Sequence, residues 1–179
     1  VIVSSKRGRI VVPVQASAEL GSSQVFMGMH WGSEFLSGRG ADGQPLAGVN
    51  ALTTSAYCPS SRQPELKHAA VKIEKAQLPW TLLAMAWLPQ EQALQAQQQL
   101  HRMMPQFAFA SCVPFGRDRT GVLFRAAAHQ APDAAVIERI EQLLGLDTLD
   151  ALRYHDPRAG QRRTARLEVG LGETRELAG

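Results

Sequence analysis

The chain is poor in cysteine and has no apolar run long enough to cross a membrane. Its 179 residues include two cysteines, Cys58 and Cys112. Neither has a Cys or His neighbour at the spacing of metal ligands, which excludes a disulfide framework and a structural zinc motif. This usage is typical of a reducing compartment, and we expect a cytoplasmic protein. The longest apolar stretch, residues 78–88, contains Pro79 and is shorter than the ~20 residues that a membrane helix needs, so no membrane partner is expected.

The chain also lacks an initiator methionine and a secretory signal. It opens with Val1-Ile2-Val3, which continues as a strand would and forms no long apolar core of a signal peptide. We therefore expect the sequence to begin inside a strand of a longer polypeptide. Residues 170–179 have the composition of a strand end or a frayed tail, and we expect an artificial cut there too.

The net charge of +3 lies in the first part of the chain. Residues 1–75 contain eight basic and five acidic side chains, whereas residues 76–179 contain eleven of each. A positive surplus suits an anionic partner such as phosphate, but a surplus this small also occurs on surfaces that bind nothing. Both interpretations stay open on charge alone.

Short strands and irregular loops make up the pattern of residues 1–75. Residues 1–5 and 10–15 flank an Arg-Gly turn, which predicts a hairpin. Further strands are predicted at residues 25–31 and 70–73. Between these lie many Gly, Ser, Pro and Asn residues with little periodicity, and long irregular loops in compact domains are usually functional or disordered. We therefore place the candidate site in residues 32–64, apart from a segment at 38–48 that resembles a surface insertion.

Apolar runs alternate with amphipathic helices from residue 76 onward, which predicts a domain boundary there and a second domain at 76–179. The expected order is strand, helix, strand, strand, helix, strand, the split βαβ pattern of ferredoxin-like domains. The overall fold class is thus expected to be α+β, with a mostly β first domain. The elements are expected at residues 80–88, 89–104, 107–113, 122–128, 132–144 and 152–155, with a further strand at 161–169 after an Asp-Pro turn.

Residues 1–75 contain four motif segments in series. They are Ser4-Ser5-Lys6-Arg7-Gly8, Val25-Phe26-Met27-Gly28-Met29-His30-Trp31, Val49-Asn50-Ala51-Leu52-Thr53, and Ser61-Arg62-Gln63-Pro64-Glu65-Leu66-Lys67 running into Val71-Lys72-Ile73. Taken in order, these segments resemble the C-terminal dinucleotide-binding domain of the dimethyl sulfoxide reductase family of molybdenum enzymes. Each segment is weak alone, but the series at this spacing is specific. The resemblance covers under half of the chain.

Within that family, the His-Trp pair, the Asn-Ala-Leu-Thr run and the following module look most like the catalytic subunit of the assimilatory nitrate reductase branch. The resemblance implies a double-psi β-barrel, incomplete at its N-terminus, that covers the guanine-dinucleotide ends of a bis(molybdopterin guanine dinucleotide) molybdenum cofactor. It implies reduction of nitrate to nitrite with electrons from an iron–sulfur cluster. The implied partners are nitrate, the remaining domains of the same enzyme, and an electron donor such as a ferredoxin, a flavodoxin or an NADH-linked reductase subunit.

The cofactor-binding residues that the resemblance implies are His30, Trp31, Asn50 and Lys67. A pyrophosphate and a pterin offer anionic oxygens and many donor and acceptor edges, so their site needs backbone amides, an amide side chain and a cation. Asn50 would hydrogen-bond the cofactor, and Lys67 would approach it as a point charge. The structural alternatives are an Asn that ends a turn, a solvated Lys, and a buried His beside a core Trp.

No catalytic residue and no metal ligand is expected in this chain. Relatives hold molybdenum through a Cys, Ser, Sec or Asp of another domain, and neither Cys58 nor Cys112 has a matching context. The Cys-rich motif of the iron–sulfur cluster is absent too and is expected only in other parts of the full-length chain, so this fragment alone should not reduce nitrate. The sequence also departs from the family pattern at Tyr57-Cys58-Pro59, where many relatives carry an acidic residue before the proline.

Two other functions stay open on the sequence, and a third is disfavoured. A formate dehydrogenase or another molybdopterin oxidoreductase would share the same domain. A stand-alone protein that binds a nucleotide and docks through its second module is a further alternative, although a barrel that starts in mid-strand would expose unpaired edges. A nucleic-acid partner is not expected, because the cluster of Arg158, Arg162, Arg163 and Arg166 lies in the part without net charge and has few interleaved aromatic residues.

Overall fold

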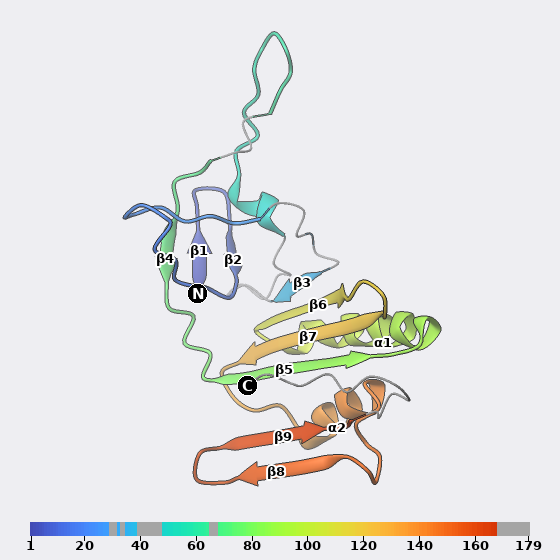
Figure 1. Ribbon diagram of the computed structural model, residues 1–179. Helices are drawn as coiled ribbons and strands as arrows, with labels where there is room; N and C mark the ends of the chain where they lie inside the picture. The colour runs from blue at the N-terminus through green and yellow to red at the C-terminus, as the bar shows by residue number, and fades with distance from the viewer. Residues whose placement is uncertain (29–31, 33–34, 39–47, 65–67, 168–179) are drawn as a thin grey trace. The chain divides into compact units, whose positions relative to one another are not determined.

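The computed structural model describes residues 1–28, 32, 35–38, 48–64 and 68–167 (Figure 1). The chain divides into two compact units, Val1–Asp133 and Ala134–Gly179, and each is described by itself. The fold is mixed, mostly sheet with few helices, in agreement with the expected α+β class. The domain boundary between residues 1–75 and 76–179 stays a prediction.

The first sheet of the Val1–Asp133 unit has three antiparallel strands in the order β2-β1-β4 (Figure 1). A turn at residues 5–8 joins β1 to β2, so the predicted hairpin is present. Its small core consists of Val3, Ile10 and Leu52. The predicted strand at 70–73 appears as β4, while 25–28 are irregular and 29–31 lie outside the described residues. The bounds are Ile2–Ser4 for β1, Arg9–Val11 for β2 and Lys72–Glu74 for β4.

The second sheet has four antiparallel strands in the order β3-β6-β7-β5. Because β7 pairs antiparallel with both β5 and β6, those two strands are parallel to each other, and helix α1 connects them. This order matches the first three strands and the first helix of the predicted split βαβ pattern. The bounds are Leu36–Gly38 for β3, Trp80–Trp87 for β5, Gln90–Met103 for α1, Met104–Gln106 for the 3-10 helix η2, Phe109–Phe115 for β6 and Gly121–Ala128 for β7.

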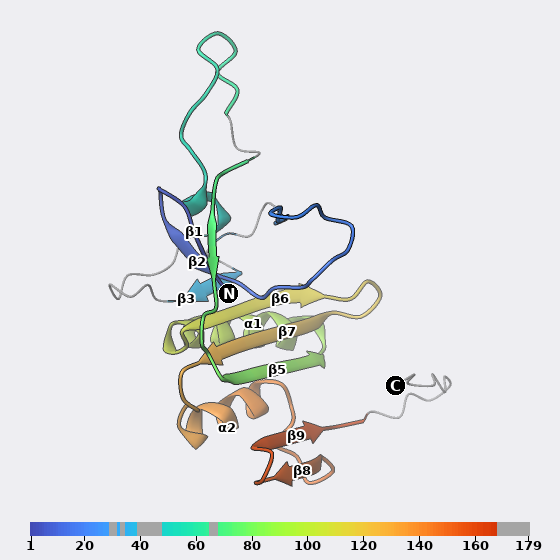
Figure 2. The same cartoon turned by 90° about the vertical axis from the view of Figure 1, so that its left-hand side faces the viewer.

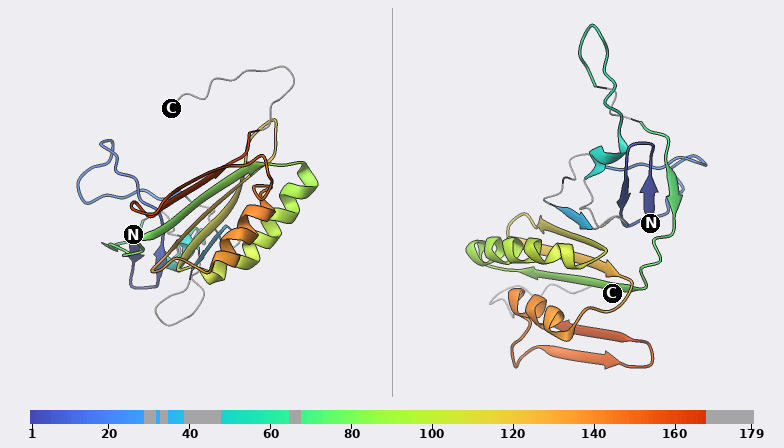
Figure 3. Two further views of the ribbon diagram at one scale, coloured as in Figure 1. Left: turned by 90° about the horizontal axis from the view of Figure 1, so that it is seen from below. Right: turned by 180° about the vertical axis from the view of Figure 1, so that it is seen from behind.

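Helix α1 covers one face of this sheet (Figure 3), and the main core lies between them. Along β5 the half-buried and exposed residues alternate strictly, as a strand with one covered face requires. In the core, the ring of Phe107 lies 5.9 Å from the rings of Trp80 and Phe124. Large apolar side chains also occur on the opposite face, where Leu83 and Trp87 are exposed.

The Ala134–Gly179 unit contains helix α2, Ala134–Leu143, and an antiparallel hairpin of β8, Leu152–Asp156, and β9, Gln161–Ala165. Gly145 follows the helix with a φ of +68°, the left-handed conformation that favours glycine after a helix end. Among the described residues β8 pairs with β9 alone. A complete ferredoxin-like fold, in which the last strand joins the main sheet, therefore stays a prediction.

A carboxylate connects α2 to the hairpin within this unit. Glu141 accepts hydrogen bonds from the Arg162 guanidinium at 2.9 Å and from the Thr164 hydroxyl at 2.8 Å. Its side chain is only 12% exposed, whereas that of Arg162 is 48% exposed. A carboxylate shielded in this way depends on its two donors to replace hydration.

Substitution of Phe124 tests which sheet face forms the core. Phe124 is 0% exposed, so Phe124→Ala should lower the free energy of unfolding by about 3–5 kcal/mol. Leu83, on the opposite face, is 64% exposed, and Leu83→Ala should change the free energy of unfolding by roughly 0.5 kcal/mol or less. Urea unfolding followed by circular dichroism measures both values. Similar losses in the two variants would contradict the assignment of the faces.

Substitution of Glu141 tests the connection between α2 and the hairpin. Glu141→Ala should lower stability by about 1.5–3 kcal/mol, because charged hydrogen bonds to Arg162 and Thr164 are lost. Glu138→Ala, on the exposed part of the same helix, is the matched control and should have little effect. Calorimetric unfolding of the two variants makes the comparison, and an equal shift in both would count against the role of Glu141.

Candidate functional site

Of the four predicted cofactor-binding residues, Asn50 lies within the described structure, whereas His30, Trp31 and Lys67 lie outside the described residues. Asn50 is the second residue of the 3-10 helix η1, Val49–Leu52, and is exposed. The structure therefore does not show whether the four residues come together. Their role in cofactor binding stays a prediction.

The backbone around Asn50 is fixed by local hydrogen bonds. The backbone N–H and the hydroxyl of Thr53 both donate to the Asn50 carbonyl, at 3.3 and 3.1 Å. At the start of the turn, the Ala51 N–H donates to the Gly48 carbonyl at 2.9 Å. On the inner side, Leu52 is buried in the core of the first sheet. With Leu52 directed inward, the exposed Asn50 lies on the outer side of η1.

The 5–8 turn lies against η1, and the two segments are neighbours in both views (Figures 1 and 2). A Cβ on Gly8 would lie 2.8 Å from the Ala51 carbonyl oxygen, so this approach requires glycine. Beside it, the Arg7 guanidinium donates to the hydroxyls of Thr54 at 3.1 Å and Ser55 at 3.2 Å. The first and third motif segments of the sequence are therefore in contact.

The shape of the 5–8 turn depends on Ser5. Its hydroxyl accepts hydrogen bonds from the backbone N–H groups of Arg7 at 3.0 Å and Gly8 at 3.4 Å. Its own N–H donates to the Gly8 carbonyl at 2.9 Å. Serine commonly stabilises turns in this way. The side chain and the backbone of one residue thus direct Arg7 and Gly8 toward η1.

A second polar loop, residues 57–64, contains Cys58, which is the exposed one of the two cysteines. The Cys58 N–H donates to the Gln63 carbonyl, and the Arg62 N–H donates to the Cys58 carbonyl, both at 2.9 Å. The Ser61 hydroxyl and nearby backbone N–H groups hydrogen-bond the Cys58 sulfur and lower the pKa of this thiol below its usual value. In contrast, Cys112 is buried in β6, and burial raises the pKa of its thiol to about 11.

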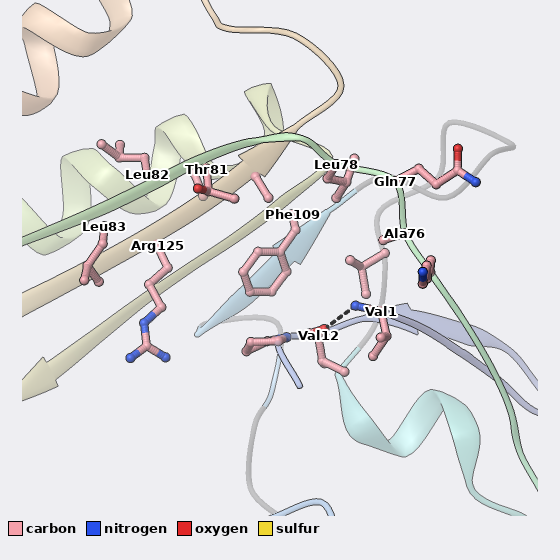
Figure 4. Close-up of a pocket in the computed structure, with 15 residues that line it drawn as sticks. Val1, Val12, Ala76, Gln77, Leu78, Thr81, Leu82, Leu83, Phe109 and Arg125 are labelled. Atoms are coloured by element: carbon pink, nitrogen blue, oxygen red, sulfur yellow. Dashed lines mark hydrogen bonds between the residues drawn. The ribbon is translucent and has the colours of Figure 1, made fainter. Parts of the chain in front are cut away.

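A cavity of about 490 Å³ lies elsewhere in the Val1–Asp133 unit (Figure 4). Most of its wall is apolar, with Val12, Leu78 and Phe109 among the lining residues, and Arg125 and Lys75 supply its positive charge. Asn50 is not among the residues that line it. A pyrophosphate requires a set of hydrogen-bond donors, and most of this wall offers none, so we keep η1 and the 5–8 turn as the candidate site.

Three arginines of the Ala134–Gly179 unit serve local structure. Arg162 pairs with Glu141, and Arg166 donates to Asp150 at 3.1 Å. Arg153 donates to backbone carbonyls that follow α2. These contacts favour a structural role over a surface that follows phosphates. The absence of a nucleic-acid partner stays a prediction.

The described ranges contain neither a cluster of metal ligands nor a membrane-spanning helix. In those ranges no group of three or more His, Cys, Asp or Glu residues is placed to hold a metal ion. None of the helices in the same ranges combines the length and the apolar character that a membrane crossing requires.

Comparisons with known proteins agree with the motif series. Residues 1–70 match the family model of the molydopterin dinucleotide binding domain, which confirms the resemblance of this part of the chain. Over 69 residues the chain is 42% identical to a nitrate reductase of Synechocystis sp., and this match covers 38% of the chain and 8% of that protein. No solved structure matches. Residues 1–70, which match the family model, contain both the 5–8 turn and η1.

The different environments of the two cysteines predict different reactivity. Since the thiolate is the reactive form, iodoacetamide should modify Cys58 in the folded protein at neutral pH and leave Cys112 unmodified until unfolding. Ser61→Ala removes the hydroxyl that lowers the Cys58 pKa, so labelling of Cys58 should slow at neutral pH and recover at alkaline pH. Peptide mass spectrometry across this pH range measures the rates. An unchanged pH profile in Ser61→Ala would show that the hydroxyl has no such effect.

Proposed function

We propose that residues 1–75 are the C-terminal part of a molybdopterin dinucleotide-binding domain in a longer molybdenum oxidoreductase. In this proposal they bind and position bis(molybdopterin guanine dinucleotide) for the reduction of nitrate to nitrite. The observation that carries the proposal is the contact between the 5–8 turn and η1, which leaves Asn50 exposed at the junction of two motif segments. The match of residues 1–70 supports a cofactor of the molybdopterin type.

The residues present at η1 fit the chemistry of such a cofactor. The carboxamide of Asn50 both donates and accepts, as a pterin or guanine edge requires. The Thr53 hydroxyl follows directly in the chain. Arg7 donates to the next two hydroxyls, those of Thr54 and Ser55. We assign Lys67 as the cation that approaches the cofactor, and His30 and Trp31 as further cofactor contacts, on the motif series alone.

The division of labour in the proposed enzyme follows from what this chain contains. When bound, the cofactor supplies the redox chemistry, and protein groups orient and insulate it. Neither a molybdenum ligand nor an iron–sulfur motif is expected among these residues, so the isolated fragment should be inactive. The remaining domains, the electron donor and nitrate would meet the cofactor elsewhere in the cytoplasmic enzyme.

The two sheets have distinct parts in the proposal. We infer that the β2-β1-β4 sheet belongs to an incomplete double-psi β-barrel. We also infer that residues 76–179 form a ferredoxin-like module with a docking or spacer role. The β5-α1-β6 connection around β7 supports the second assignment. A formate dehydrogenase or another molybdopterin oxidoreductase is the second candidate, since the match of residues 1–70 suits any of these enzymes. The residues around molybdenum, which are expected upstream, would distinguish them from a nitrate reductase.

Cofactor retention in the complete enzyme tests the proposal. Asn50→Ala and Lys67→Ala each remove a contact to an ionised or polar ligand, and about 1.5 kcal/mol per contact corresponds to roughly tenfold weaker binding. Molybdenum and guanosine monophosphate retained after gel filtration should fall accordingly. Gln92→Ala, an exposed amide on α1, is the matched control and should retain both. Full cofactor content in both site variants would refute the assignment.

A further inference from the structure

Arg7 connects two segments that lie far apart in the chain. We propose that Arg7 is a positioning residue, which holds the segment after η1 so that Asn50 keeps the conformation needed for cofactor binding. The inference rests on the proposed function of Asn50. It assigns Arg7 a role through Thr54 and Ser55, not a contact with the cofactor.

The first support is the geometry of the guanidinium. One terminal nitrogen donates to the Thr54 hydroxyl at 3.1 Å, and the other donates to the Ser55 hydroxyl at 3.2 Å. The planar fork of an arginine suits two neighbouring acceptors, whereas a lysine offers one compact charge on a flexible stem. The arrangement therefore depends on arginine and not only on a positive charge.

The second support is a short path from Arg7 to Asn50, in which hydrogen bonds at both ends are joined by the peptide bond between Thr53 and Thr54. The Thr54 hydroxyl that accepts from Arg7 also accepts from the Ala56 N–H at 3.1 Å. The preceding residue, Thr53, donates twice to the Asn50 carbonyl. Arg7 thus fixes the segment that in turn closes η1 over Asn50.

The third support is that η1 needs a constraint on its outer side. On the inner side, Leu52 is anchored among Val3 and Ile10. A 3-10 helix of four residues has little stability of its own, because its hydrogen bonds are few and poorly aligned. The outer constraint comes from Arg7, next to the close approach of Gly8 to Ala51.

Two variants separate positioning from direct binding in the full-length enzyme. Arg7→Gln removes the guanidinium, and the double variant Thr54→Val/Ser55→Ala removes its acceptors while keeping the charge. In cofactor-free enzyme, both should raise hydrogen exchange of residues 49–56 about tenfold, the effect of losing roughly 1.4 kcal/mol of local stability. Both should lower retained molybdenum and guanosine monophosphate to a similar extent. Lys6→Gln, at the neighbouring exposed cation, is the control and should change neither.

The remaining comparisons decide between outcomes. Arg7→Gln should cause no further cofactor loss in an Asn50→Ala background, because both act on one contact. Arg7→Lys should retain about as little cofactor as Arg7→Gln. Full retention in Arg7→Lys, or normal retention in Thr54→Val/Ser55→Ala together with loss in Arg7→Gln, would overturn positioning and indicate a direct charge contact. If Asn50→Ala lowers retention but neither positioning variant does, the inference about Arg7 fails alone; if Asn50→Ala retains all cofactor, the proposed function fails with it.

Discussion

The approach of the Gly8 backbone to the Ala51 carbonyl determines how the first part of the chain is arranged. Since no side chain fits between them, the β1–β2 hairpin and η1 pack backbone against backbone. That packing directs Leu52 into the core with Val3 and Ile10 and leaves Asn50 exposed. The apolar interior and the polar site are therefore two sides of the same short helix, and a change in one is felt in the other.

Two arginines of residues 1–75 differ from two arginines of the Ala134–Gly179 unit in what they contact. Arg7 donates to neutral hydroxyls, and the Arg62 guanidinium lies 5.7 Å from the Tyr57 ring centre, so neither charge is cancelled by a carboxylate in these contacts. In the other unit, Arg162 and Arg166 pair with acidic side chains. Arg7 and Arg62 thus add to the positive surplus of residues 1–75, whereas Lys72 in the same part pairs with Glu74 at 2.8 Å. Such a surplus suits an anionic partner, as the proposed function requires.

Local patterns in the sequence predicted the local structure. The Arg-Gly turn, the apolar spacing of α1 and the glycine after α2 each correspond to an observed element. Pairing between distant segments was not predictable from periodicity: β3 lies in a stretch that was predicted to be a loop, yet it pairs with β6. The contact of Arg7 with Thr54 spans 47 positions, and no repeat or spacing in a single sequence connects them. Asn50 was predicted as a cofactor contact from its motif, whereas Arg7 and Gly8 were assigned to a turn and to the first motif segment without a role of their own.

Exposure limits what the candidate site can do alone. Arg7, Asn50 and Ser55 are exposed, and Thr53 and Thr54 are half-buried. Hydrogen bonds in such positions contribute about 0.5–1.5 kcal/mol each, while nanomolar binding needs about 12 kcal/mol. A few such bonds therefore cannot retain a large cofactor, although they can fix the orientation of one end of it. In the proposed enzyme, most of the binding free energy would then come from other surfaces, namely His30, Trp31 and Lys67 of this chain and the remaining domains of the longer polypeptide. The match covers 8% of the related nitrate reductase, which leaves room for such domains. The 5–8 turn and η1 would contribute orientation, and the enclosure that excludes water would belong to the rest of the proposed enzyme.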